Sequence, residues 1–138
     1  VDGMAPEFTE GRSVLIIGGG YIGLEAAAVA AKKGLKVTLV EMADRILQRV
    51  AAPETSNYFR TLHSAHGVDI REGVGLERLT GEGRVSGAIL SDGTKLDVDF
   101  AIVGAEGQYG NATFQLNGSE FFANEWSHCK MFHRVKCE

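Results

Sequence analysis

The sequence predicts an α/β domain built on a central parallel sheet. Three observations favour this fold class: short apolar runs rich in β-branched residues, a glycine-rich turn after the first run, and an alanine-rich helical segment between the first two runs. Continuous apolar runs are typical of strands covered on both faces, and strands that alternate with helices form parallel sheets. The chain has 138 residues, which is enough for one domain with a sizeable buried core.

The first third of the chain predicts a βαβ unit. A strand is expected at residues 13–17, where a serine leads into a run of valine, leucine and isoleucine. Apolar residues at helical spacing follow from Ile22, and Gly34 supplies a C-terminal stop for that helix. The second strand is expected at residues 36–41. Strand, glycine-rich turn, helix and strand in this order are typical of a nucleotide-binding half-fold.

The turn fits the pattern G-x-G-x-x-G, with Gly18, Gly20 and Gly23 in the glycine positions. The first glycine allows the tight turn, the second lets the backbone approach a pyrophosphate, and the third lets the helix pack closely on the strand. The N-terminus of the helix then directs its N–H groups and positive dipole end at the phosphates. In this context the motif predicts a Rossmann-like, three-layer, dinucleotide-binding domain rather than a purely structural turn.

Glu41 lies about twenty residues beyond the loop, where a carboxylate accepts hydrogen bonds from the adenosine ribose hydroxyls. The same charge repels a 2′-phosphate, and sites for the phosphorylated cofactor place an arginine nearby. Arg45 is the candidate for such an arginine, but Asp44 beside it weakens that case. The sequence therefore favours NADH over NADPH. The alternative is that Glu41 is only a solvated strand end.

Residues 42–52 are expected to form an exposed connection, because their charges are mixed. Pro53 then suits the first turn of a second helix. His63 and His66 lie in the last turn of that helix, without cysteine or carboxylate at ligand spacing, and are assigned structural or surface roles. A third strand is expected at residues 68–71.

Alternating patterns after the third strand predict a β-meander in place of another crossover helix. Its short strands are expected at residues 75–80, 84–90 and 95–99, separated by glycine-containing turns. A last buried strand at residues 100–103 is expected to join the parallel sheet beside the first strand. The pattern identifies no catalytic residue, so the catalytic set is unknown.

Composition and charge exclude several function classes. The formal net charge of −4 gives no electrostatic footprint for nucleic acid or anionic lipid. The apolar stretches are far shorter than the roughly 20 residues that span a bilayer, and no secretory leader pattern opens the chain. Cys129 and Cys137 do not make a disulfide framework. We therefore expect a cytoplasmic domain that binds neither nucleic acid nor membrane.

The tail, residues 105–138, is expected to be helical from about residue 120. Its apolar residues fit one broad helical face, which favours a homodimer; they include Phe121, Phe122, Trp126 and Phe132. Cys129, His133 and Cys137 are spaced four residues apart and could offer soft ligands to zinc. No compact metal motif is present, so a packed or incidental cluster is the stronger interpretation.

Three stretches carry a family resemblance: residues 14–27 (VLIIGGGYIGLEAA), residues 36–41 (KVTLVE) and residues 90–104. Together they make residues 12–104 resemble the NAD(H)-binding domain of the pyridine nucleotide-disulfide oxidoreductase superfamily. Within it, the chain is most similar to the FAD-dependent ferredoxin, rubredoxin and putidaredoxin reductase branch. Residues 1–11 are then an N-terminal extension, and residues 105–138 are a tail unrelated to the family pattern.

The resemblance implies roles for individual residues. The three motif glycines cradle the pyrophosphate, and Glu41 faces the adenosine ribose. Tyr21 and Ile22 flank the nicotinamide path, and Glu25 lies near the nicotinamide carboxamide, although Glu25 otherwise reads as an ordinary solvated helix residue. Gly104, where the match ends, completes the implied cofactor-binding set.

The resemblance also implies a function. Family members are longer and carry an FAD-binding domain and an interface domain, so FAD is expected for the family without a site in this chain. The flavin converts hydride transfer into single-electron steps toward a metal-cluster protein. We therefore expect the NAD(H)-binding domain of an NADH:ferredoxin-type oxidoreductase, truncated relative to the family, and whether it turns over alone is open. The alternatives are a stand-alone NAD-binding module without turnover and a new activity of the tail, such as metal-assisted hydrolysis.

Overall fold

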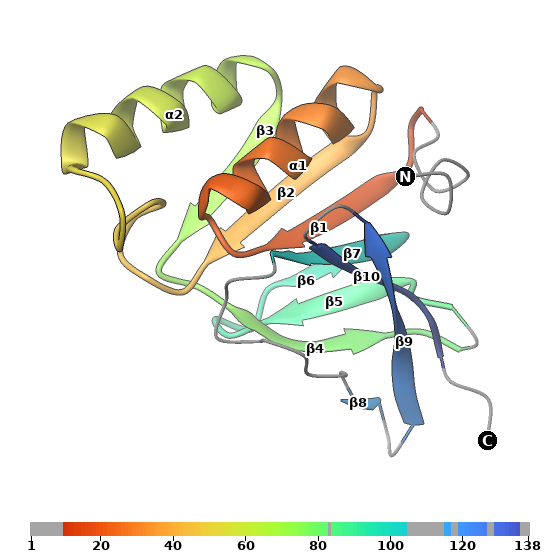
Figure 1. Cartoon of the computed structure of the whole chain (residues 1–138). Coiled ribbons are helices and arrows are strands. Elements are labelled where there is room, and N and C mark those ends of the chain that lie inside the picture. The colour runs from red at the N-terminus through yellow and green to blue at the C-terminus, as the bar shows by residue number, and fades with distance from the viewer. Residues whose placement is uncertain (1–9, 83, 105–114, 117–118, 127–128, 136–138) are drawn as a thin grey trace.

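The computed structural model describes residues 10–82, 84–104, 115–116, 119–126 and 129–135. Two sheets organise this part of the chain, a seven-stranded sheet of order β3-β2-β1-β7-β10-β9-β8 and a three-stranded sheet of order β4-β5-β6 (Figure 1). Among the described residues, the helices are too short or too polar to cross a membrane.

The N-terminal half forms the predicted βαβ unit and its extension. Strand β1 (Ser13–Ile17) pairs in parallel with β2 (Lys36–Glu41), which pairs in parallel with β3 (Val68–Glu72). Helix α1 (Tyr21–Lys32) connects β1 to β2, and helix α2 (Pro53–Ala65) precedes β3. Proline at the start of α2 lacks an N–H that the first turn would leave unpaired, which is why the helix begins there.

The predicted meander is confirmed as the antiparallel sheet of β4 (Leu76–Thr80), β5 (Gly87–Leu90) and β6 (Lys95–Asp97). Strand β7 (Phe100–Gly104) then returns to the parallel sheet beside β1, as its apolar run predicts. The α/β, Rossmann-like prediction is therefore confirmed, with the meander standing where a helix would otherwise cross.

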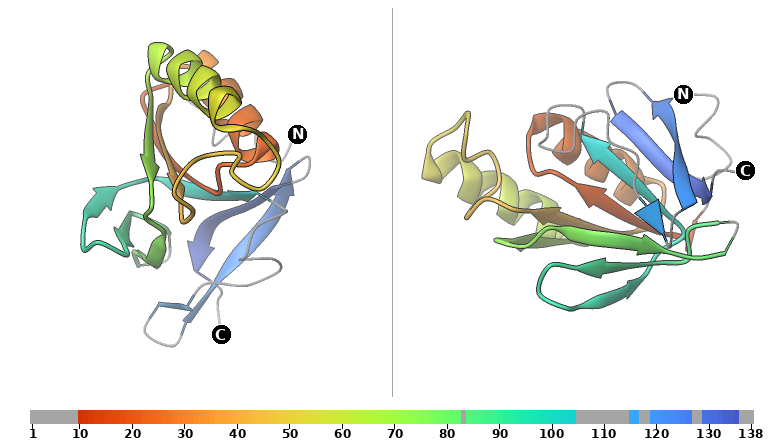
Figure 2. Two further views of the ribbon diagram at one scale, coloured as in Figure 1. Left: turned by 90° about the vertical axis from the view of Figure 1, so that its left-hand side faces the viewer. Right: turned by 90° about the horizontal axis from the view of Figure 1, so that it is seen from below.

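Three layers result, with α1 and α2 on one face of the parallel strands and the meander on the other (Figure 2). Alternate residues of β1 serve the two faces: Val14 and Ile16 pack with the helices, whereas Leu15 and Ile17 pack with the meander. All four are at most 1% exposed. This two-sided burial explains why β1 is apolar throughout instead of alternating.

The prediction of an exposed connection at residues 42–52 is wrong for Ile46 and Leu47, which are 0% and 2% exposed. Leu47 adopts a left-handed backbone conformation with φ of 58°. Both side chains belong to the hydrophobic cluster that also contains the buried hydrophobic residues of α1. The mixed charges of the neighbouring residues led to the wrong prediction that these two side chains are exposed.

The helix expected from about residue 120 is also wrong, because β9 (Ser119–Trp126) and β10 (Cys129–Val135) form an antiparallel hairpin. Strand β10 pairs with β7, and the short strand β8 (Gln115–Leu116) pairs with β9. The buried strand β7 needs partners for its backbone groups on the side away from β1, and β10 supplies them.

The strand structure removes the argument for two tail expectations. A helical apolar face was the basis for the homodimer, and the residues concerned lie in strands. The zinc interpretation assumed one helical face, but Cys129 and His133 lie in β10 with an irregular register after Phe132. Cys137 lies outside the described residues. No cluster of three or more metal-ligating side chains occurs in the described part of the chain.

Candidate functional site

The glycine-rich loop joins β1 to α1 at the carboxyl edge of the parallel strands. Gly18 has φ of +108°, a conformation that L side chains rarely adopt. Its N–H donates a 2.9 Å hydrogen bond to the carbonyl oxygen of Val40 on β2. The first glycine of the motif therefore makes the turn that its position predicts.

Gly20 and Gly23 have opposite surroundings. A Cβ at Gly23 would overlap the carbonyl oxygen of Gly18, so only glycine lets α1 pack this closely on the loop. A Cβ at Gly20 would meet nothing within 4 Å, so the space over this residue is open. Gly20 caps α1 without a side-chain hydrogen bond, and the first turn carries no acidic residue. The backbone N–H groups of that turn can therefore receive an anion.

Glu41 is tied to this loop by both carboxylate oxygens. Oε1 accepts the N–H of Gly19 at 2.7 Å, and Oε2 accepts the N–H of Ala43 at 2.8 Å. Each oxygen has a second lone pair with which it can accept a hydrogen bond from a hydroxyl. Glu41 is thus a fixed, half-buried group beside the glycine loop and not merely a solvated strand end.

Ile46 and Leu47 also contact the loop, a role that sequence reasoning missed. The side chain of Ile46 covers Gly19 so closely that a Cβ there would lie 2.7 Å from Ile46 Cγ2. The N–H of Leu47 donates to the carbonyl oxygen of Gly19 at 2.9 Å. The available signal in the sequence was an additional glycine, Gly19, at a position that the motif leaves variable.

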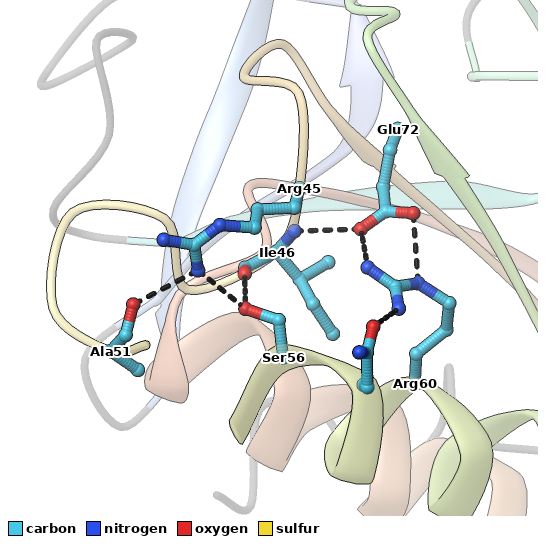
Figure 3. A network of polar contacts seen from close by, with 7 residues as sticks. Arg45, Ile46, Ala51, Ser56, Arg60 and Glu72 are labelled. Carbon is cyan, nitrogen blue, oxygen red and sulfur yellow. Dashed lines mark hydrogen bonds and ion pairs between the residues drawn. The ribbon is translucent and has the colours of Figure 1, made fainter. Parts of the chain in front are cut away.

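A polar network holds Ile46 from two sides, as Figure 3 shows. Its N–H donates to Glu72 Oε2 at 2.8 Å, and its carbonyl oxygen accepts the hydroxyl of Ser56 at 2.5 Å. Ser56 is fully buried, and its oxygen also accepts a 2.7 Å hydrogen bond from Arg45. Arg45 donates in addition to the carbonyl oxygen of Ala51 at 2.9 Å. The candidate phosphate-binding arginine is therefore engaged within its own connection.

Glu72 also pairs with Arg60 of α2. The guanidinium donates to both carboxylate oxygens, at 2.9 and 2.6 Å. Burial raises the pKa of Glu72, but the hydrogen bonds from Arg60 and the Ile46 N–H, with the charge of Arg60, outweigh it and hold that pKa below its ordinary value. The hydrogen bond to Glu72 raises the pKa of Arg60 against a smaller opposing effect of burial. Both groups are therefore charged at neutral pH.

The other residues implied by the resemblance lie around the same edge. Tyr21 and Ile22 open α1, Tyr21 being 51% exposed with its ring edge-to-face against Phe59. Glu25 is exposed on the next turn of α1. Gly104 directly follows Val103, whose register partner is Ile17, so its backbone lies at the strand edge where Gly18 begins the loop. The structure thus brings the glycines, Glu41 and Gly104 to one end of the sheet.

The two histidines lie elsewhere, under or on the helices. His63 is 7% exposed, and its ring nitrogens lie 2.9 and 3.0 Å from the carbonyl oxygens of Phe59 and Leu24. His66 is exposed, with Nδ1 2.9 Å from the carbonyl oxygen of Leu62. All three contacts are with helix backbone, which fits a structural role for His63 and a surface role for His66.

A sequence model of the pyridine nucleotide-disulphide oxidoreductase family matches residues 2–135 of this chain. The chain belongs to this family. The expected resemblance is confirmed, and the match extends on both sides of residues 12–104. The division into residues 1–11, 12–104 and 105–138 stays a prediction.

Several similar proteins are ferredoxin reductases or related electron-transfer reductases. The ferredoxin reductase subunit of a 5,5′-dehydrodivanillate O-demethylase from Sphingobium sp. is 47% identical over 106 residues, which are 75% of this chain and 26% of the relative. Putidaredoxin reductase from Pseudomonas putida is 46% identical over 94 residues, 66% of this chain and 22% of the relative. The chain therefore spans about a quarter of the length of these relatives.

Solved structures agree with the family and the fold. A ferredoxin reductase from Rhodopseudomonas palustris matches with a TM-score of 0.68 and 44% identity, over 74% of this chain and 25% of that one. Putidaredoxin reductase in its covalent complex with putidaredoxin matches with a TM-score of 0.69 and 40% identity, over 75% and 25% of the two chains.

Proposed function

We propose that this chain binds NAD(H) as the nicotinamide-nucleotide domain of an FAD-dependent NADH:ferredoxin-type oxidoreductase. The observation that carries the proposal is the glycine loop with Glu41 bound to it. This arrangement fits a pyrophosphate site. The open space at Gly20 lets the ligand approach the backbone, and the absence of a side chain at Gly23 lets α1 pack closely on the loop. Two of the similar proteins reported above are named as ferredoxin reductases, and this supports the reaction class.

The first turn of α1 holds the pyrophosphate. Its N–H groups lack intrahelical partners and stand at the positive end of the helix dipole, where an anion is favoured. Gly20 leaves the approach free of a side chain. Gly18 and Gly23 fix the loop against the helix, so the donors are in place before the ligand arrives.

Glu41 reads the adenosine ribose. Its carboxylate has accepting capacity beyond the two backbone bonds and can accept hydrogen bonds from the 2′- and 3′-hydroxyls. A 2′-phosphate would face this negative charge, while the Arg45 guanidinium is bound to Ala51 and Ser56. NADH is therefore preferred over NADPH.

The nicotinamide end lies along Tyr21, Ile22, Glu25 and Gly104. These residues line the same edge, from the first turns of α1 to the end of β7. In this role Tyr21 and Ile22 flank the ring and Glu25 binds the carboxamide. NADH bound here would supply a hydride, and single-electron transfer to a metal-cluster protein would require the flavin of the family. This chain's own contribution is to bind and orient the nucleotide.

Calorimetric titration with NADH, NADPH and ADP-ribose tests the proposal. We expect saturable binding of NADH and ADP-ribose and at least about tenfold weaker binding of NADPH, because the carboxylate and the added phosphate repel each other. ADP-ribose separates the pyrophosphate and ribose contacts from those to the nicotinamide. Absence of binding by both NADH and ADP-ribose would overturn the proposal, and equal affinity for NADH and NADPH would overturn the assigned role of Glu41.

A further inference from the structure

We propose that Glu72 is a positioning residue for the dinucleotide loop, acting through Ile46 on Gly19. Glu72 lies at the end of β3 and is held by Arg60 of α2, so the inference links the helical layer to the nucleotide site. The inference rests on the proposed function, because it says that Glu72 influences the affinity of that same site for the dinucleotide without contacting the ligand.

The first step is the contact between Glu72 and the connection after β2. Oε2 of Glu72 accepts the N–H of Ile46 at 2.8 Å and is itself bound by Arg60 at 2.6 Å. The Glu72 side chain is 19% exposed. A carboxylate with a bidentate arginine on one side and a backbone donor on the other has one favoured orientation. The Ile46 N–H is thereby fixed relative to α2 and β3.

The second step is the hydrogen bond to the carbonyl group of Ile46. The fully buried hydroxyl of Ser56 donates to the carbonyl oxygen of Ile46. Ile46 is thus bound through both backbone groups, one by β3 and one by α2 (Figure 3). Its side chain is 0% exposed and cannot rotate away without opening the core beneath the helices.

The third step is the contact of Ile46 and Leu47 with Gly19 in the glycine-rich loop. Ile46 Cγ2 and Cβ lie over Gly19, and the next residue, Leu47, donates its N–H to the Gly19 carbonyl oxygen at 2.9 Å. The Gly19 N–H is held by Glu41 at 2.7 Å. Both backbone groups of Gly19, the residue between the turn glycine and the helix cap, are therefore bound by residues 41–47.

Affinity follows from this arrangement. A loop whose backbone is already ordered loses little conformational freedom when the pyrophosphate binds. Removing the acceptor for Ile46 N–H loosens residues 46–47, and Gly19 then samples orientations that the ligand must exclude. We expect the penalty for every ligand that contains the pyrophosphate, whether or not it carries nicotinamide.

The test compares Glu72→Met with Asp69→Asn. The first removes the acceptor at similar side-chain length, whereas the second breaks the exposed Asp69–Arg71 pair on the same strand without touching Ile46. For Glu72→Met we expect the Kd of both NADH and ADP-ribose to rise about fivefold or more, and for Asp69→Asn to change less than about twofold. Glu72→Gln keeps an acceptor oxygen for Ile46 and is expected to recover most of the affinity.

Amide hydrogen exchange without nucleotide gives a second readout. Exchange of the Gly19 and Leu47 amides should be faster in Glu72→Met than in Asp69→Asn, and close to the parent rate in Glu72→Gln. If Glu72→Met does not fold, Arg60→Met, which removes the partner that orients Glu72, takes its place. A purely structural role would lower the melting temperature and leave the Kd and these amides unchanged, which would overturn the inference. If the parent chain bound neither NADH nor ADP-ribose, the proposed function would fail. If NADH binding were intact and the exchange of the Gly19 and Leu47 amides were unchanged in Glu72→Met, only the inference about Glu72 would be overturned.

Discussion

The carboxylate of Glu41 accepts the N–H of Gly19 at 2.7 Å, across 22 residues of chain. This bond joins the end of β2 to the loop that follows β1. It means that the residue proposed to read the ribose is also part of the loop proposed to hold the pyrophosphate. A change at Glu41 therefore acts on the ribose contacts and on the loop together.

Glu41→Gln should weaken NADH binding and reduce the discrimination against NADPH. The amide can still accept one backbone N–H, but it has no charge to strengthen the ribose contacts or to repel a 2′-phosphate. Loss of a charge-assisted hydrogen bond corresponds to about 1.5–3 kcal/mol, or at least about tenfold in the Kd of NADH. Calorimetric titration of both nucleotides measures the ratio.

The matched control is Glu77→Gln, because Glu77 is an exposed glutamate on β4. It makes the same chemical change far along the chain from the loop and should leave both affinities unaltered. An unchanged ratio of the NADPH and NADH dissociation constants in Glu41→Gln would contradict the ribose-reading role.

Alanine at Gly20 and at Gly23 should have different consequences. At Gly23 the added Cβ would overlap the backbone oxygen of Gly18, so the helix or loop must shift, and overpacking of this kind costs about 1–3 kcal/mol or more of unfolding free energy. At Gly20 the space is open, and φ of −80° suits alanine. That variant should lose no more than about 1 kcal/mol through poorer capping, yet bind NADH more weakly because its methyl group enters the approach to the α1 N-terminus.

Urea unfolding and NADH titration of the two variants separate folding from binding. A Gly20→Ala protein with parent affinity would show that nothing approaches the backbone at that position. Equal stability of Gly23→Ala and the parent would contradict the close packing between loop and helix.

Strands β1 to β7 and both described helices follow from local patterns that tertiary contacts reinforce. The run at Val14–Ile17 is apolar because it is covered on two faces, and Pro53 and Gly34 act at helix ends through their own backbone preferences. Two of the motif glycines follow from geometry within a few residues, because Gly18 has a positive φ and a Cβ at Gly23 would overlap the Gly18 carbonyl oxygen.

The remaining features depend on partners distant in the sequence. The backbone groups of Ile46 are hydrogen-bonded by Ser56 of α2 and Glu72 of β3. The residues next to Ile46 in the sequence give no indication of these partners. The apolar residues of β9 and β10 satisfy a helical spacing as well as a strand, and the open side of β7 decides between them. Local periodicity cannot show such a competition.

Ser56→Ala should destabilise the fold. The hydroxyl is fully buried and bridges the carbonyl oxygen of Ile46 and the guanidinium of Arg45, so its removal leaves both without this partner. Leaving a buried polar group unsatisfied costs about 1–3 kcal/mol of unfolding free energy. Ser64→Ala, at an exposed site on the same helix, should change stability by less than about 0.5 kcal/mol. Urea denaturation compares the two, and similar losses would contradict the bridging role.

The stabilising contribution of Glu72 should disappear at acid pH. Its folded-state pKa lies below the ordinary value of 4.5, so unfolded chains bind this proton first as the pH falls. The contribution is therefore complete above the ordinary glutamate pKa and is lost as the pH drops through the lowered folded-state value.

Unfolding free energies of the parent and Glu72→Gln, measured between about pH 6 and about pH 3, test this sign. The parent should be the more stable protein near pH 6, and its advantage should shrink steadily below the ordinary glutamate pKa. The gap narrows because protonated Glu72, like glutamine, is neutral and no longer attracts Arg60. A gap that stays constant, or widens toward acid pH, would mean that the carboxylate is not stabilised by Arg60 and the Ile46 N–H in the folded chain.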